Sequence, residues 1–360
     1  MTSTNPTKII LSGGGTLGPV FPLLALAEKI TSAYPAAEFL WLGTKNGPER
    51  DIVKAHGIRF RDLSAGKFRR YFSWRNFRDL FLIKWGFWQA LFLLAREKPA
   101  IVVSAGGFNS VPTVWAAWFL RIPCFIHQQD LQPGLANRLM APFAREITVA
   151  FKTTLRHFQT RKTTWIGNPV RAEIFQGDSV RALQTFHLEN DLPTVLIIGG
   201  GTGATGLNDL VLKSLPALTK FCQIVHSTGP GKSTSVKNPR YHPFDFIKQG
   251  LPDIMAAADL VVTRAGLSTL SELAVLGKPM VIIPMPDSHQ EINARYFERH
   301  QSAIVAAQKK LTPAKLTNLI ATLLRDQPHR ALLGQHARAT FPADAAKRWL
   351  AILRPWLNRV

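Results

Sequence analysis

The chain has few cysteines, few acidic residues and no long apolar segment. Only Cys124 and Cys222 occur in 360 residues, which excludes a disulfide framework and favours reduced thiols in a core. No uninterrupted apolar stretch reaches the roughly 18 to 20 residues that a membrane-spanning helix needs. The first seven residues are polar and lack a hydrophobic signal segment. This composition is typical of a cytosolic globular protein, with length for two cores.

The shortage of acidic residues leaves a strongly basic chain, with 44 Lys and Arg against 23 Asp and Glu and a net charge of +21. Such an excess indicates an anionic partner. It is dense between Arg61 and Lys98, where nine cations face three acids and aromatic residues stand between them. Cations and aromatics in this mixture suit an interfacial helix on anionic lipid. The predicted membrane-docking residues are Lys67, Arg69, Arg70, Trp74, Phe77, Phe81 and Trp85, and Trp115 and Trp118 could extend the patch.

Two other interpretations of this segment stay open. It could be a core helix with a solvated basic face, although nine cations exceed what such a helix needs. Basic residues between aromatics also suit single-stranded nucleic acid. The segment is rich in Leu and Ile, which do not stack on bases, and no nucleic-acid-binding motif occurs elsewhere. We therefore expect anionic lipids and no nucleic acid among the partners.

Two glycine-rich loops indicate the architecture. The apolar run 8–11 leads into Ser12-Gly-Gly-Gly-Thr-Leu-Gly-Pro19 and a helix-like segment, and the run 193–198 leads into Gly199-Gly-Gly-Thr-Gly-Ala204 and another. Glycines there let a backbone approach a ligand at a helix start. Further buried parallel strands are predicted at 39–42, 101–104, 124–127, 146–149, 223–226, 260–263 and 280–283. The chain is thus predicted to form two similar α/β halves that divide near Gly167–Val170.

The second half carries the more specific pattern. Arg264-Ala-Gly-Leu-Ser-Thr-Leu-Ser-Glu272 follows one predicted strand, and His289-Gln-Glu-Ile-Asn293 follows the next. A short helix start offers N–H groups to a diphosphate, and Glu272 can accept hydrogen bonds from a ribose diol. Either residue, Glu272 or Gln290, taken alone could be a helix-start or capping side chain. Their position after successive strands favours a sugar-nucleotide site.

In this order and spacing, the motifs resemble the MurG family of GT-B glycosyltransferases, which transfer N-acetylglucosamine (GlcNAc) from UDP-GlcNAc to lipid I (undecaprenyl-pyrophosphoryl-MurNAc-pentapeptide) to give lipid II. The resemblance covers nearly the whole chain through SAGGFNSVP at 104–112, HQQDLQPGLANRL at 127–139, GNPVR at 167–171, HSTGPGK at 226–232, TRAGLSTLSELAVLGKP at 263–279 and HQEINA at 289–294.

The resemblance implies an α/β GT-B fold with two Rossmann-like doubly wound domains facing a cleft. It implies an acceptor and membrane-docking domain at 1–166, a UDP-sugar domain at 167–340 and a C-terminal helix at 341–360 that packs back on the first domain. It also implies peripheral attachment to the cytoplasmic face of the bacterial membrane and an inverting reaction with no cofactor and no metal. The implied substrate-binding residues are Thr16, Leu17, Gly18, Asp130, Asn137, Arg171, Gly201, Thr202, Gly203, Leu267, Ser268, Thr269, Leu270, Ser271, Glu272 and Gln290. Among these, Glu272 would hold the ribose, Gln290 the GlcNAc ring, and Arg171 with the second glycine loop the diphosphate.

The sequence departs from the family where catalysis is expected. The family usually has T-G-G-H in the first loop and H-E-Q-N in the middle, whereas this chain has Pro19 and Gln128 at the titratable positions. Neither can act as a base. Asp130 and His127 are then the candidate catalytic residues, although Asp130 could equally bind a sugar hydroxyl. A weakly active or inactive relative that binds UDP-sugar or lipid I, and a transferase with another lipid acceptor, remain the alternatives.

Overall fold

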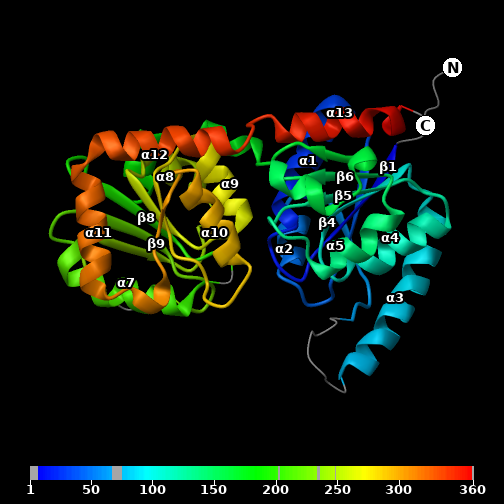
Figure 1. The fold of residues 1–360 in the computed structure, drawn as a ribbon, viewed down its shortest axis with the longest axis horizontal. Helices are drawn as coiled ribbons and strands as arrows, with labels where there is room; N and C mark the ends of the chain where they lie inside the picture. The colour runs from blue at the N-terminus through cyan, green and yellow to red at the C-terminus, as the bar shows by residue number, and fades with distance from the viewer. Residues whose placement is uncertain (1–6, 67–74, 202, 233–235, 248, 359–360) are drawn as a thin grey trace. The chain divides into compact units, whose positions relative to one another are not determined.

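The computed structural model describes residues 7–66, 75–201, 203–232, 236–247 and 249–358, with the backbone alone for 75–80. The chain forms two compact units (Figure 1). Unit 1 comprises Met1–Arg171 and Ala343–Val360, and unit 2 comprises Ala172–Pro342. The sequence-based domain limits were residues 166/167 and 340/341.

Unit 1 contains a seven-stranded parallel sheet in the order β3-β2-β1-β4-β5-β6-β7. Its strands are β1 (Lys8–Gly13), β2 (Glu38–Gly43), β3 (Arg59–Asp62), β4 (Ile101–Gly106), β5 (Cys124–Gln128), β6 (Glu146–Val149) and β7 (Thr163–Trp165). The strand order reverses between β1 and β4. In open α/β sheets, ligands bind beyond the carboxyl ends of the strands at such a reversal.

Both faces of this sheet are covered by helices because its strands are apolar on both sides. Ile9 and Leu11 pack with α1 and α13, whereas Ile10 packs with α3 and α4 on the other face. The C-terminal helix α13 lies against α1 and buries Trp349 completely (Figure 1). The helices of unit 1 are α1 (Val20–Ala33), α2 (Glu49–Ala55), α3 (Arg75–Glu97), α4 (Ser110–Phe119), α5 (Leu135–Met140), α13 (Ala345–Leu357) and the 3₁₀ helices η1 (Ala141–Phe143), η2 (Lys152–His157) and η3 (Thr160–Lys162).

Unit 2 repeats the plan with a six-stranded parallel sheet in the order β10-β9-β8-β11-β12-β13. Its strands are β8 (Thr194–Ile198), β9 (Gln223–Ser227), β10 (Tyr241–Phe244), β11 (Leu260–Thr263), β12 (Met280–Ile282) and β13 (Ile304–Val305). One face packs against α7 and α11. The helices are α6 (Ser179–Thr185), α7 (Thr205–Leu218), α8 (Leu251–Ala257), α9 (Leu267–Leu276), α10 (Gln290–Arg299), α11 (Pro313–Arg325), α12 (Gln327–Thr340), η4 (Ala172–Gln176) and η5 (Gln308–Lys310).

Each strand predicted from an apolar run is present, and the doubly wound α/β architecture is confirmed. The segment predicted at 280–283 ends one residue earlier, at Ile282. Four strands had not been predicted, namely β3, β7, β10 and β13. Within the described residues, no helix has the length and apolar character that crossing a bilayer requires.

Candidate functional site

The first glycine loop joins β1 to α1, and two side chains form hydrogen bonds with its backbone. The Trp41 indole N–H donates to the carbonyl of Gly13 at 2.9 Å, and the Glu49 carboxylate accepts the N–H of Gly15 at 3.3 Å. Gly15 has a φ of +79°, in the region that favours glycine. Beyond it, Thr16 is exposed and Leu17 and Gly18 are half-buried. The three residues predicted to bind substrate therefore lie on the accessible side of an anchored loop.

A second cluster lies at the carboxyl end of β5. The Gln128 amide donates to the carbonyl of Asp130 at 2.8 Å, and its oxygen accepts from Asn137 Nδ2 at 2.6 Å. Asn137 also donates to the carbonyl of His127 at 3.1 Å and is 5% exposed. Asp130 is half-buried. The Gln128 side chain thus stabilises the turn that contains Asp130. Because an amide cannot take up a proton, Gln128 has a structural role in this cluster.

His127 is buried and lies within hydrogen-bond distance of another side chain at each ring nitrogen. It is fully buried, its Nδ1 lies 2.9 Å from Thr148 Oγ1, and its Nε2 lies 3.1 Å from Asn168 Oδ1. Burial lowers the pKa of His127 to about 4, against the hydrogen bond with Asn168. A base must reach the proton that it removes. The assignment of catalysis to His127 or Asp130 stays a prediction, and of the two Asp130 has the more accessible side chain.

Unit 2 contains a matching buried imidazole. His226 on β9 lies 3.0 Å from the Tyr241 hydroxyl and 3.2 Å from Asn208 Oδ1, and burial lowers its pKa to about 4. An unfolded histidine titrates near 6.5. Between about pH 6.5 and 4 the unfolded chain therefore binds protons that the folded chain does not.

We expect the free energy of unfolding to fall as pH drops from about 6.5 towards 4, because stability rises with pH wherever the unfolded state holds more protons. Urea unfolding across this range measures the slope. The variant His226→Gln should flatten it, whereas replacement of the exposed His300 serves as the control. An equal slope in the parent and His226→Gln would contradict the assignment.

The second glycine loop joins β8 to α7. Gly200 and Gly203 have φ values of +89° and +71°, and the Gly203 N–H donates to the carbonyl of Gly200 at 2.9 Å. A Cβ at Gly203 would overlap the backbone of Thr228, so only glycine fits there. Lys232 donates to the carbonyl of Gly203 at 3.3 Å. Of the three predicted residues, Gly201 and Gly203 are described and Thr202 lies outside the described residues.

The loops after β11 and β12 are tied together by two side chains. Gln290 Oε1 accepts the N–H of Met285 at 3.0 Å and that of Ala265 at 3.3 Å. Arg264 donates to the carbonyls of Ile283 and Pro284 at 2.9 and 3.1 Å. Gln290 therefore acts as a loop clamp in this structure. The sequence did not single out Arg264, whose partners are backbone carbonyls of a different loop.

The predicted donor stretch 267–272 begins α9. Leu267, Leu270 and Ser271 are buried, and the Leu270 N–H already donates to the carbonyl of Gly266 at 3.0 Å, so these side chains pack α9 into the unit. Ser268 and Thr269 are half-buried, and Glu272 is 4% exposed. The first turn of a helix has N–H groups without helical partners. Its chemistry suits an oxygen-rich ligand.

Arg171 ends unit 1, with its guanidinium 4.8 Å from the ring centre of Phe21 on α1.

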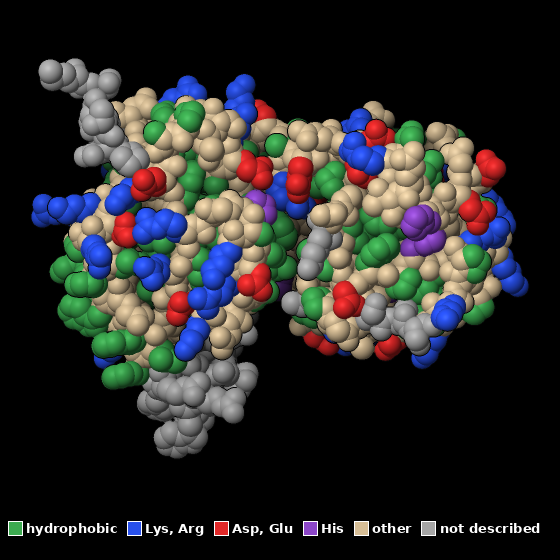
Figure 2. Space-filling model, turned by 180° about the vertical axis from the view of Figure 1, so that it is seen from behind, with side chains coloured by type: hydrophobic (Ala, Val, Ile, Leu, Met, Phe, Trp, Pro, Cys, Tyr) green, Lys and Arg blue, Asp and Glu red, His purple; other side chains and the backbone are tan. Residues whose placement is uncertain are grey.

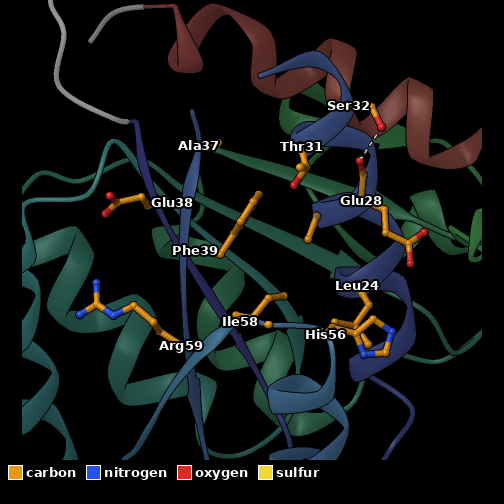
Figure 3. A pocket seen from close by; sticks show the side chains of 12 residues that line it. Leu24, Glu28, Thr31, Ser32, Ala37, Glu38, Phe39, His56, Ile58 and Arg59 are labelled. Carbon is orange, nitrogen blue, oxygen red and sulfur yellow. Dashed lines mark hydrogen bonds between the residues drawn. The ribbon is translucent and has the colours of Figure 1, made fainter. Parts of the chain in front are cut away.

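Unit 1 also has a cavity of about 720 Å³ beside α1, β2 and β3 (Figure 3). Glu38 and Arg59, the first residues of β2 and β3, line it. It therefore lies at the amino ends of these strands, away from the glycine loops. No cluster of three His, Cys, Asp or Glu side chains with metal-binding geometry occurs among the described residues.

The predicted docking residues lie partly outside the described region. Lys67, Arg69, Arg70 and Trp74 are not described, and Phe77 lies in α3 with its backbone alone described. Phe81 and Trp85 are 69% and 53% exposed on α3. Trp88 and Phe92 continue the same stripe at helical spacing, and Trp118 at the end of α4 is 55% exposed. Figure 2 shows hydrophobic side chains gathered on unit 1 over this region, with Lys and Arg nearby.

Comparison with known proteins identifies glycosyltransferases in both halves of the chain. Residues 9–149 match the glycosyltransferase family 28 N-terminal domain, and residues 194–349 match the family's C-terminal domain. Two curated relatives carry the description UDP-N-acetylglucosamine--N-acetylmuramyl-(pentapeptide) pyrophosphoryl-undecaprenol N-acetylglucosamine transferase. The one from Geobacillus thermodenitrificans is 37% identical and the one from Clostridium novyi 38%, each over 89% of this chain and 91% of the relative.

Solved structures show the same fold. MurG from Acinetobacter baumannii aligns with a TM-score of 0.73 at 23% identity, over 97% of this chain and all of that one. UDP-GlcNAc 2-epimerase from Neisseria meningitidis, bound to UDP-GlcNAc, aligns with a TM-score of 0.68 at 12% identity, over 97% of this chain and 100% of that one.

Proposed function

Because the chain belongs to glycosyltransferase family 28, among its UDP-GlcNAc-dependent transferases of peptidoglycan synthesis, we propose that it transfers GlcNAc from UDP-GlcNAc to lipid I and so forms lipid II. The observation that carries this proposal is 37–38% identity to such transferases over 89% of the chain. In the reaction, a bond forms between the C4 oxygen of MurNAc and C1 of GlcNAc, the bond from C1 to the UDP oxygen breaks, and the acceptor hydroxyl loses a proton.

The donor is assigned to the loops of unit 2. Glu272 would accept hydrogen bonds from the ribose, and the loop 199–204 with Arg171 would meet the diphosphate. The GlcNAc ring would lie against Gln290, whose oxygen already fixes the loops after β11 and β12. Thr16, Leu17 and Gly18 of the first glycine loop are assigned to the sugar nucleotide as well. Hydrogen-bond donors fixed before the ligand arrives stabilise developing charge at little reorganisation cost.

The direct test is incubation of the purified chain with UDP-GlcNAc and a short-chain lipid I analogue, followed by measurement of UDP release and of lipid II. Formation of both products supports the transferase. Binding of UDP-GlcNAc without product would instead favour a binding relative, in which Pro19 and Gln128 replace the family's titratable residues. Transfer to a different lipid acceptor, with lipid I unused, would favour the other transferase.

The proposal places unit 1 on the anionic, cytoplasmic surface of the membrane through α3, α4 and α5. Trp88 and Trp115 line an apolar cavity of about 480 Å³ with Leu135 and Leu139 of α5. Lys84, on the same rim, and Arg96 and Lys98 at the end of α3 are exposed cations. Aromatic groups that enter the acyl boundary, beside cations that meet headgroups, suit such attachment.

The variant Phe81→Ser/Trp85→Ser/Trp88→Ser/Phe92→Ser should bind anionic vesicles at least tenfold more weakly, because burial of each large apolar side chain contributes roughly 1.5 to 3 kcal/mol. Parent binding should rise with anionic lipid and fall with salt, since each nearby cation contributes about 1 kcal/mol. Vesicle co-sedimentation measures both. Phe175→Ser, an aromatic that is 50% exposed in unit 2, is the matched control. Equal binding to neutral and anionic vesicles, or tighter binding to single-stranded RNA, would contradict the proposal.

A further inference from the structure

Glu49 is a buried carboxylate to which the proposed chemistry gives no role. It is the first residue of α2, directly after the turn that follows β2, and its side chain is fully buried. It accepts hydrogen bonds from the backbone N–H of Thr44 at 2.7 Å, from the Thr44 hydroxyl at 2.6 Å and from the backbone N–H of Gly15 at 3.3 Å. The bond to Gly15 crosses 34 residues of sequence and reaches the first glycine loop.

Glycines on two loops make room for this carboxylate. A Cβ at Gly14 or at Gly47 would overlap Glu49 itself, and a Cβ at Gly43 would come close to it. Gly14 lies between Glu49 and the loop after β4, because a Cβ at Gly107 would overlap the backbone of Gly14. The loops after β1, β2 and β4 are therefore in direct contact, with the carboxylate at one side of the group.

A buried carboxylate is costly unless it is hydrogen-bonded, and its bonds are stronger than those between neutral groups. Glu49 therefore holds the Gly15 N–H more firmly than a neutral acceptor could. The Gly13 carbonyl is fixed by Trp41 on the other side of the turn. Both ends of the Gly13–Gly15 turn are therefore fixed. The backbone that carries Thr16 and Gly18 then has little conformational freedom left to lose when a ligand binds.

We propose that Glu49 is a positioning residue that sets the conformation of the first glycine loop for binding of the sugar end of the donor. The inference rests on the proposed function, which assigns Thr16, Leu17 and Gly18 to UDP-GlcNAc. It predicts a division between ligands. UDP lacks the GlcNAc group, and the proposal assigns it to Glu272, to the second glycine loop and to Arg171, so its binding does not depend on Glu49, whereas UDP-GlcNAc binding does.

The test is calorimetric titration of Glu49→Gln and Glu49→Ala with UDP and with UDP-GlcNAc. Glutamine keeps the size of the side chain but replaces one acceptor oxygen with an NH₂ donor. Both Glu49 oxygens accept from N–H or hydroxyl donors, so this NH₂ group would face another donor. We expect Glu49→Gln to raise the Kd for UDP-GlcNAc roughly tenfold, equal to about 1.4 kcal/mol, and to leave the Kd for UDP unchanged. Asp51→Asn removes the same charge from an exposed position in the same turn of α2 and is the matched control.

Hydrogen exchange of the Gly13–Gly18 segment is the second measurement and needs no activity. Faster exchange there in Glu49→Gln, with exchange in unit 2 unchanged, supports positioning. A lower Tm with unchanged Kd values for both ligands would assign Glu49 to stability alone and overturn the inference. Absence of GlcNAc transfer in the parent would overturn the proposed function and leave the Kd comparison valid. If Glu49→Ala does not fold, the glutamine variant still decides the question.

Discussion

Replacement of Asp130 with Asn is expected to lower kcat by roughly 10² to 10⁴-fold, the range that general base catalysis contributes. The family's usual acid is absent, because Gln128 holds that position and its amide is bonded to Asn137 and to the Asp130 backbone. His127 is buried and engaged at both ring nitrogens. Asp130 is half-buried at the turn that follows β5 and can present a carboxylate. Single-turnover measurement of GlcNAc transfer to a lipid I analogue would report the effect.

The Kd for UDP-GlcNAc in Asp130→Asn separates a base from a sugar ligand. If Asp130 is the base, Asp130→Asn should lower kcat while the Kd for UDP-GlcNAc stays within about twofold of the parent's. If Asp130 only binds a sugar hydroxyl, the variant should bind UDP-GlcNAc more weakly. Asparagine is also the residue that the family usually has at this position. A variant as active as the parent would therefore show that the base lies elsewhere. If the parent is inactive and Pro19→His with Gln128→Glu transfers GlcNAc, the chain is a binding relative of the enzymes.

The sequence predicted the central strands and missed the edges for a physical reason. The four unpredicted strands, β3, β7, β10 and β13, are the outermost strands of the two sheets. A central parallel strand is buried on both faces and is read as a continuous apolar run. An edge strand is short and tolerates charge or proline. Arg59–Asp62 carries three charged residues, and Tyr241–Phe244 contains Pro243.

The candidate site was predictable where glycine and polar residues follow a strand directly. The loops after β1, β8 and β11 were recognised in this way. Glu49 and Arg264 were not, because each acts on the backbone of a loop distant in sequence. Glu49 reaches Gly15, and Arg264 reaches Pro284. The order of residues contains no local sign of such a partner. The burial of His127 and its contacts with Thr148 and Asn168 likewise depend on residues that are distant in sequence.

Replacement of Glu272 with Ala is expected to weaken UDP-GlcNAc binding by about 2 to 3 kcal/mol, or roughly 30- to 150-fold. The reason is that the variant lacks the carboxylate that would accept charge-assisted hydrogen bonds from the two ribose hydroxyls. Glu272 lies in α9, whose start is fixed by Gln290 through Ala265 and by Arg264. Calorimetry with UDP-GlcNAc and with UDP should show equal losses, since both ligands contain the ribose. Glu298→Ala removes an exposed carboxylate of unit 2 and is the control.

A deoxyribose analogue of UDP tests the same contact from the ligand side. The parent should bind 2′-deoxy-UDP less tightly than UDP, and Glu272→Ala should bind the two with similar Kd values, because the hydroxyl then has no carboxylate to meet. Since Glu272 is 4% exposed, the variant also leaves a small void, and its Tm gives the cost to stability separately. A variant that still prefers UDP over the deoxy analogue by the parent's ratio would place the ribose away from α9.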